Sequence, residues 1–339
     1  MQIYLPVGFI ENGEFTPEQL EARTDVLEEL GIEQRLQIQL QEGFLNFSEK
    51  VAQYLNGAID EPLLFHDRHG YISEKALPTI VSDLETVAHF GDKARLKQPP
   101  IVTYHGPMMF ASWEEAVLEH EKRKLPLEAP TYTAKKFLSE QEKSLLLLGK
   151  IKRKADKLGI EVLLENVPGL DYVYKAGTDT RDKRWKGTGW LPELIDLGVL
   201  YVTAKGLNYA FENLGIASAV DIEHLVFTYG EKHSEGAINE LKNVRVAHVG
   251  AANRAIVRGS IGSHLPFIGD YPLVDWPYLI NTFPKYLRAL MDKGVKMLVH
   301  EHHLGFYKGK EYVKPTVESI RQLQYLIVAA ENLKNGKSF

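Results

Sequence analysis

The sequence predicts a single (β/α)8 barrel over residues 1–339. Two observations lead to this prediction: eight short apolar runs with strand character follow one another along the chain, and segments with helical character alternate with them. A third argues against the competing open, doubly wound sheet. Such a sheet would have a glycine-rich turn after its first strand, and residues 7–13 lack that pattern.

The eight expected strands are short and rich in Val, Ile and Leu, as is typical of strands buried on both faces of a parallel sheet. The fifth is the clearest, because Gly159 precedes its apolar run and the acid Glu165 ends it. The strands are expected at residues 3–7, 35–40, 62–66, 100–105, 160–165, 217–221, 244–248 and 295–301.

The expected helices lie between these strands. The first has Thr16 as its cap and Pro17 in its first turn, where proline is favoured. Helices are expected at residues 16–30, 48–55, 73–90, 112–124, 134–158, 191–197, 204–214, 276–293 and 316–333. Residues 171–190 interrupt the alternation with a long polar loop after the fifth strand, and a loop of this length in a compact domain is usually functional or disordered.

Composition narrows the class of protein. The formal net charge of −5 argues against holding nucleic acid as the main function, because phosphate contacts need clustered Lys and Arg. The absence of cysteine excludes disulfides, thiolate metal ligands and cysteine nucleophiles. No run reaches the apolar length of a membrane span, and no signal peptide is recognisable. A cytoplasmic protein that is not bound to membranes is expected, and assembly into a homo-oligomer is left open.

Imidazole and carboxylate side chains recur at the ends of the apolar runs. Because active sites of (β/α)8 barrels lie at the carboxyl ends of the strands, these side chains are expected to converge. Mixed histidine and carboxylate ligands suit divalent zinc, manganese, cobalt or magnesium, with one or two ions per chain. The residues concerned are His66, His105, Glu165, Asp221, His224, His248, His264 and Glu301.

Four short motifs carry a family resemblance: Leu164-Glu165-Asn166, Asp221-Ile222-Glu223-His224, Ala247-His248-Val249 and His300-Glu301. In this order and spacing the chain resembles the xylose isomerase-like TIM-barrel superfamily, which includes sugar isomerases, sugar epimerases and endonuclease IV. The resemblance implies that one ion is held by Glu165, Asp221, His248 and Glu301. An arginine six residues after the strand-seven histidine, here Arg254, and the stretch 264–270 also match the family.

The endonuclease IV branch has further metal ligands, and its additional histidines match in order. They imply a candidate second site made of His66, His105, His224 and His264. The Asp-x-His of that branch reads Gly262-Ser263-His264 here, so a carboxylate ligand of the third ion is missing. Residues 65–67 also resemble the Phe-His-Asp of xylose isomerase, although the further Asp of that motif is His69 here.

The first functional hypothesis is a metal-dependent isomerase or epimerase of a sugar or sugar phosphate. A metal-stabilised enediolate would form, with Glu165 and Glu301 moving the proton off and onto carbon. Arg254, His224 and Trp185 are the candidate substrate contacts.

The alternative is an endonuclease IV-like phosphodiesterase acting on abasic DNA, with the basic loop 181–186 and its Trp185 beside the bases. That loop would serve equally as a lid over a small anionic substrate. A third reading is a barrel that binds an ion or a sugar without turnover.

Overall fold

The computed structural model describes residues 1–7, 17–32, 35–40, 42–55, 60–67, 72–107, 134–166, 200–201, 203–229, 231–251, 266–268, 274, 276–301 and 313–336. The expected helices at residues 112–124 and 191–197 and the polar loop at residues 171–190 lie outside these residues. So do three candidate site residues, Trp185, Arg254 and His264.

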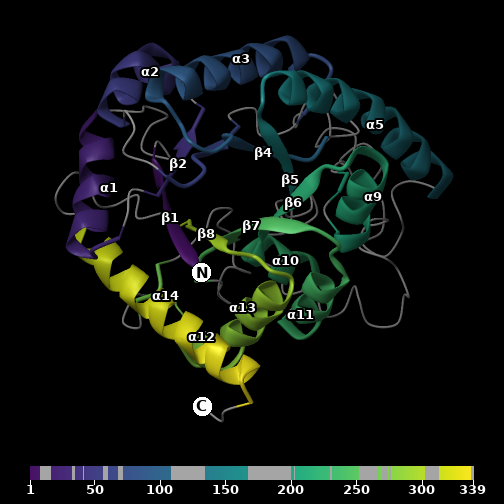
Figure 1. Cartoon of the computed structure of the whole chain (residues 1–339). Coiled ribbons are helices and arrows are strands. Elements are labelled where there is room, and N and C mark those ends of the chain that lie inside the picture. Colours follow the sequence, from purple (N-terminus) through teal and green to yellow (C-terminus); the bar gives the residue numbers. More distant parts are fainter. Residues whose placement is uncertain are drawn as a thin grey trace, which may run out of the picture.

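Eight parallel strands pair in sequence order and close into a barrel, as predicted (Figure 1). Closure comes from pairing of the first strand with the last, where Gln2 lies opposite Met297 and Tyr4 opposite Val299. The strands are β1 (Gln2–Val7), β2 (Leu36–Gln39), β3 (Leu64–His66), β4 (Ile101–His105), β5 (Glu161–Glu165), β6 (Ala217–Asp221), β7 (Val244–Val249) and β8 (Met297–His300).

The described helices surround the barrel (Figure 1). The last of them in the chain, α14, packs against both α1 and α13, so the C-terminal helix covers the place where the barrel closes. The helices are α1 (Pro17–Glu29), α2 (Glu42–Leu55), α3 (Leu77–Ala94), α5 (Ala134–Lys157), α9 (Ala204–Leu214), α10 (Ile222–Tyr229), α11 (Glu231–Glu240), α12 (Trp276–Asn281), α13 (Phe283–Asp292) and α14 (Val313–Lys334).

The helices differ from the predictions in several places, and α3 (Leu77–Ala94) lies four residues later than expected. The helix expected at residues 276–293 is two helices, because Thr282 separates α12 from α13 and Pro284 occupies the first turn of α13, where its missing N–H is tolerated. Helices α10 and α11 were not predicted. Helix α10 begins at Ile222, directly after the last residue of β6, so no loop in the sequence separates the two elements. Helix α2 begins at Glu42, six residues earlier than expected.

Two glycines end helices and direct the chain into the next strand. Gly159 follows α5 and Gly215 follows α9, and both have a φ of 68°. This left-handed conformation is open to glycine at little cost and is common immediately after a helix. In each case the strand begins two residues later, at Glu161 in β5 and at Ala217 in β6.

A small apolar cluster fills the inside of the barrel and is separate from the larger core between the strands and the helices. Side chains alternate between the two faces of a strand, so the residue two positions further on points to the same side. Two positions beyond Leu64, Leu163, Ala219, Val246 and Val299 of this inner cluster are His66, Glu165, Asp221, His248 and Glu301. The strand period therefore directs all five chemical groups inward, at the carboxyl end of the barrel.

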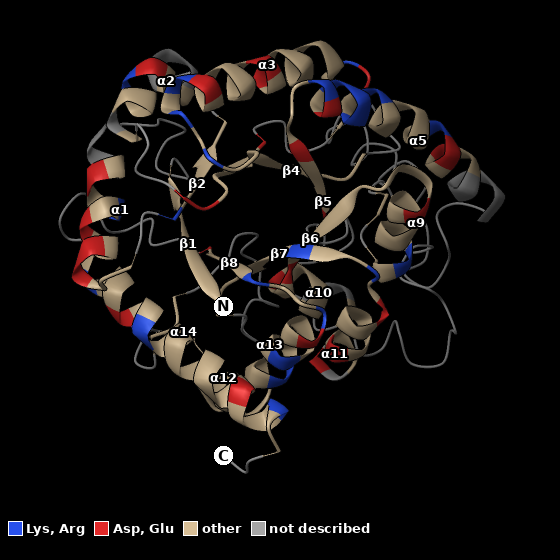
Figure 2. Ribbon diagram, in the orientation of Figure 1, with Lys and Arg blue, Asp and Glu red and all other residues tan. Residues whose placement is uncertain are grey.

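Charged side chains of both signs are distributed over the outer helices (Figure 2). Helix α5 carries a concentration of basic residues, some of which form ion pairs, including Lys152 with Asp156 and Lys154 with Glu85. Within the described residues, no helix has the length and apolar character needed to cross a membrane.

Candidate metal centre

Four side chains from consecutive strands meet at the carboxyl end of the barrel. Glu165, Asp221 and His248 lie on β5, β6 and β7, and Glu301 follows β8 directly. Their donor atoms all lie within 4.8 Å of one another, and none of the four residues is more than 2% exposed. The set is the one that the sequence resemblance implied as ligands of a single ion.

His248 stands between the two glutamates. Its Nδ1 lies 3.0 Å from Oε1 of Glu165 and 3.0 Å from Oε2 of Glu301. Neither contact has hydrogen-bond geometry, and Nδ1 has no hydrogen-bond partner among the described residues. Donor atoms around one ion with bonds of about 2.1 Å are separated by about 3 Å. The spacing and directions therefore suit donors arranged around a common cation.

Charge balance also favours a cation here. Three carboxylates buried together are costly unless positive charge accompanies them. Burial by itself would raise the pKa of Glu165, but the neighbouring His248 and His66 hold it well below its usual range. Burial would lower the pKa of His248, but Glu165 and Glu301 raise it well above its usual range. Without a metal, protonated imidazoles supply the positive charge that a divalent ion would bring, so this buried cluster could hold a metal.

The second oxygen of Glu165 faces a different pair of histidines. His66 Nε2 lies 2.9 Å from Oε2 of Glu165, and His105 Nε2 lies 3.7 Å from the same atom. The two imidazole rings meet edge to face with centroids 4.8 Å apart. The Glu165 carboxylate therefore lies between two groups of potential ligands, with Oε1 toward His248 and Oε2 toward His66 and His105.

Both ring nitrogens of His66 face acceptors. Nδ1 donates to the backbone carbonyl of Asp67 at 3.0 Å, and Nε2 donates to Glu165. Two donating nitrogens require the protonated ring. Burial opposes that charge, but the hydrogen bond and negative charge of Glu165, with Asp67, raise the pKa of His66 to about 9.

A reciprocal contact joins the ends of β5 and β6. The Asn166 side chain donates to the backbone carbonyl of Asp221 at 3.0 Å and accepts from its N–H at 2.9 Å. Asp221 Oδ1 accepts from the backbone N–H of His224 at 2.8 Å, which caps α10 and explains the three-residue spacing of the pair. His224 Nδ1 donates to the Asn166 carbonyl at 2.8 Å, so in the neutral ring the lone pair lies on Nε2.

Two polar residues of the site were not predicted to have a role. Asn166 follows the strand acid directly and is fully buried. Gln37 on β2 is 1% exposed, and its Nε2 lies 3.1 Å from Nε2 of His248. Its signal in the sequence is the alternation Leu36-Gln37-Ile38-Gln39, which places polar side chains on one face of an otherwise apolar strand.

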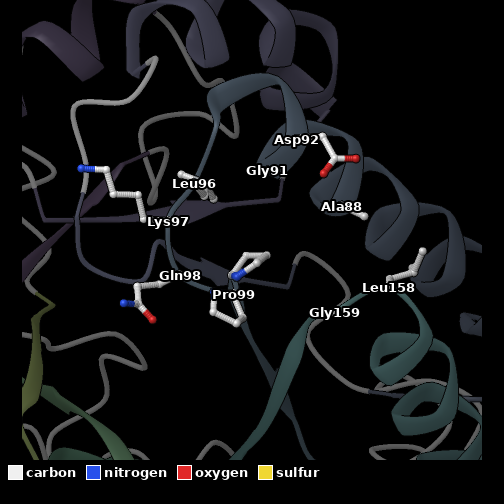
Figure 3. Close-up of a pocket in the computed structure, with 10 residues that line it drawn as sticks. Ala88, Gly91, Asp92, Leu96, Lys97, Gln98, Pro99, Leu158 and Gly159 are labelled. Carbon is white, nitrogen blue, oxygen red and sulfur yellow. The ribbon is translucent and has the colours of Figure 1, made fainter.

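A cavity of about 300 Å3 lies at the opposite end of the barrel (Figure 3). Its wall includes Gly91 of α3, Pro100 directly before β4 and Gly159 two residues before β5. None of the candidate ligands that the structure describes lines this cavity, so it is separate from the cluster at the carboxyl ends of the strands.

Comparison with protein-family models gives no match, and comparison with curated proteins gives none either. Solved structures do match. A D-tagatose 3-epimerase-like protein is 12% identical with a TM-score of 0.58, covering 98% of this chain and 99% of that one. A xylose isomerase domain protein from Alicyclobacillus acidocaldarius is 16% identical with a TM-score of 0.53, covering 98% and 99%.

The IolI protein, solved with a bound zinc atom, is 11% identical with a TM-score of 0.56, and the match covers 96% of this chain and 98% of that one. At these identities the comparisons establish the fold, over nearly the whole length of both partners. They agree with the resemblance found in the four sequence motifs. The protein has the fold of the xylose isomerase-like TIM barrels.

Proposed function

We propose that the protein is a divalent-metal-dependent isomerase or epimerase of a sugar or sugar phosphate. The observation that carries the proposal is the placement of two buried carboxylates, Glu165 and Glu301, each 3.0 Å from Nδ1 of one histidine. Two structurally similar proteins are named as an epimerase-like protein and a xylose isomerase domain protein, which supports this class of chemistry. A cytoplasmic location stays a prediction, and the identity of the sugar and assembly into a homo-oligomer stay open.

The residues that would hold the ion are Glu165, Asp221, His248 and Glu301. Bound there, a divalent ion would supply Lewis-acid polarisation of a substrate carbonyl and its neighbouring hydroxyl. Mixed carboxylate and imidazole donors suit zinc, manganese, cobalt or magnesium. His105 and His224 are more exposed than the four ligands, with 23% and 14% of their side chains accessible, so they would meet the substrate from the open side.

The two glutamates would carry the proton. One carboxylate removes the proton from the carbon beside the carbonyl, and the other returns a proton to carbon, as general base and general acid. The low pKa of Glu165 keeps it ionised and ready to accept. Because the carboxylate that returns a proton must take that proton from solvent between turnovers, turnover in D2O would place deuterium on the carbon.

The test compares Glu301→Gln and Glu165→Gln with wild type after metal loading. Each protein is incubated in D2O with a panel of ketoses and aldoses, and deuterium at carbon is followed by NMR. We expect wild type to exchange and both variants to lose at least a hundredfold in rate. Glu161→Gln is the matched control, because Glu161 starts the same strand and pairs with Arg245 at the other end of the barrel. Undiminished turnover by Glu301→Gln contradicts the two-carboxylate mechanism.

A second candidate is an endonuclease IV-like phosphodiesterase, favoured by His66 and His105 beside Oε2 of Glu165. Glu165, His66 and His105 would hold a second ion beside the first, and a pair of ions would supply the charge stabilisation that phosphodiester hydrolysis needs. Two ions per chain and chelator-sensitive nicking of abasic duplex DNA would favour this candidate. His105→Asn would then abolish nicking, whereas a one-ion isomerase would keep its metal content after the same change.

A further inference from the structure

We propose that Gln37 is a positioning residue that holds the ring of His248 in the tautomer presenting Nδ1 to the metal. The inference rests on the metal site proposed above and extends it to β2, a strand that contributes none of the ligands implied by the sequence. It concerns a contact between two side chains that are both almost completely buried.

The contact is between the Gln37 amide and Nε2 of His248, at 3.1 Å. Gln37 points into the barrel, on the same face of β2 as Gln39. Its Nε2 faces the ring, and its Oε1 has no hydrogen-bond partner among the described residues. The oxygen and nitrogen of a terminal amide are similar in size, and their assignment follows from the hydrogen bonds around them.

The chemistry of His248 decides that assignment. Nδ1 faces Glu165 and Glu301, so it is the nitrogen whose lone pair would bind the ion. The hydrogen of a neutral, ligating imidazole must then lie on Nε2, which becomes a donor. An amide nitrogen cannot accept from it, whereas Oε1 can. Rotating the Gln37 amide by half a turn therefore pairs Nε2–H with Oε1 and gives that oxygen its partner.

Two other histidines of the site follow the same rule with backbone acceptors. Nδ1 of His66 donates to the carbonyl of Asp67, and Nδ1 of His224 donates to the carbonyl of Asn166. Metal-binding histidines generally donate their second N–H to an acceptor of this kind, which orients the ring. The ring of His248 has the Gln37 side chain in that place, so here the tautomer depends on a residue that mutation can change.

The experiment measures zinc affinity by competition with a chromophoric chelator. Gln37→Leu removes the acceptor, Gln37→Glu keeps an acceptor at similar length, and Thr103→Val is the control for an apolar replacement inside the barrel, where Thr103 is 1% exposed. We expect Gln37→Leu to bind zinc about 10- to 100-fold more weakly. Gln37→Glu should stay within about fivefold of wild type, because its carboxylate also accepts from Nε2–H. Thr103→Val should bind as wild type does.

Two outcomes overturn the role of Gln37: equal affinity of Gln37→Leu and wild type, or equal losses in Gln37→Leu and Gln37→Glu, which would mean a packing role. A wild-type protein that binds no zinc would instead overturn the proposed metal site itself. If Gln37→Leu fails to fold, 15N–1H spectra of histidine-labelled wild type test the inference instead, because they show which ring nitrogen carries the proton. In the zinc-loaded protein the His248 signals, assigned with His248→Asn, should show the proton on Nε2; a proton on Nδ1 refutes the inference.

Discussion

Nε2 of His66 lies 2.9 Å from Oε2 of Glu165, and both side chains are almost completely buried. The contact joins β3 to β5 across the barrel mouth, and it couples the charge of the central carboxylate to a ring outside the four-ligand set. Glu165 is therefore placed for both of the roles proposed above: ligand, through its position beside His248, and base, with a proton affinity that depends on His66.

Replacing His66 by Gln is expected to move the acidic limb of the pH–activity profile to higher pH. His248 and His66 lower the pKa of Glu165, so removing one of them raises that pKa and protonates the carboxylate at a less acidic pH. The measurement is the pH dependence of metal-loaded turnover. His105→Gln is the control, because His105 is further from Oε2, at 3.7 Å, and its loss should move the limb less. Identical limbs in wild type and His66→Gln would contradict the coupling.

The metal-free protein is expected to lose stability as the pH rises toward 9. The pKa of His66 is raised from 6.5 to about 9, so the stability from its protonated form is fully present below about pH 6.5 and is lost as the pH rises through about 9. The loss should be on the order of 3 kcal/mol, since each pKa unit corresponds to about 1.4 kcal/mol. Urea unfolding in chelator at a series of pH values measures it. His66→Gln should reduce the slope of the unfolding free energy against pH. An unchanged slope would mean that groups other than His66 cause the loss of stability.

Asp221→Asn and Asp221→Ala are expected to separate two functions of one side chain. Oδ1 caps α10 through the N–H of His224, and asparagine caps about as well as aspartate. Asp221→Asn should keep the unfolding free energy of the metal-free protein, and Asp221→Ala should lower it by about 0.5–2 kcal/mol. Both should weaken metal binding, because both remove a proposed carboxylate ligand. Titration calorimetry and urea unfolding check the two effects, and full metal affinity in Asp221→Asn would remove Asp221 from the ligand set.

Gly250→Ala is expected to disturb the metal centre through the backbone. A Cβ there would lie 2.6 Å from Oε1 of Glu223 and 2.9 Å from the backbone carbonyl of Glu301, so the chain beside a proposed ligand must shift. The unfolding free energy should fall by about 1–3 kcal/mol, with weaker metal binding. The control is Gly236→Ala in α11, where the added methyl meets nothing within 4 Å and should stabilise by about 0.4–1 kcal/mol.

Much of the fold follows from local pattern. The eight apolar runs became the eight strands, and the helix expected at residues 204–214 has those limits in the structure. Such elements are encoded in residues close together in the chain, by strand composition and by Gly215 after α9. Helices α10 and α11 were missed because α10 begins directly after β6, with no loop between them, and because both helices are short, with 8 and 10 residues.

Most of the candidate ligands were found from the sequence because they occupy the same place, at or directly after the carboxyl end of a strand. Barrel closure then determines that His66, Glu165, Asp221, His248 and Glu301 approach one another. The sequence by itself therefore determined the barrel and the types of donor at its mouth.

Only the tertiary structure decided how these donors are paired. Glu165 has Oε1 beside His248 and Oε2 beside His66, and Gln37 contacts Nε2 of His248. These contacts depend on distances across the barrel. Those distances arise from the closure and stagger of all eight strands, which no local stretch of sequence contains.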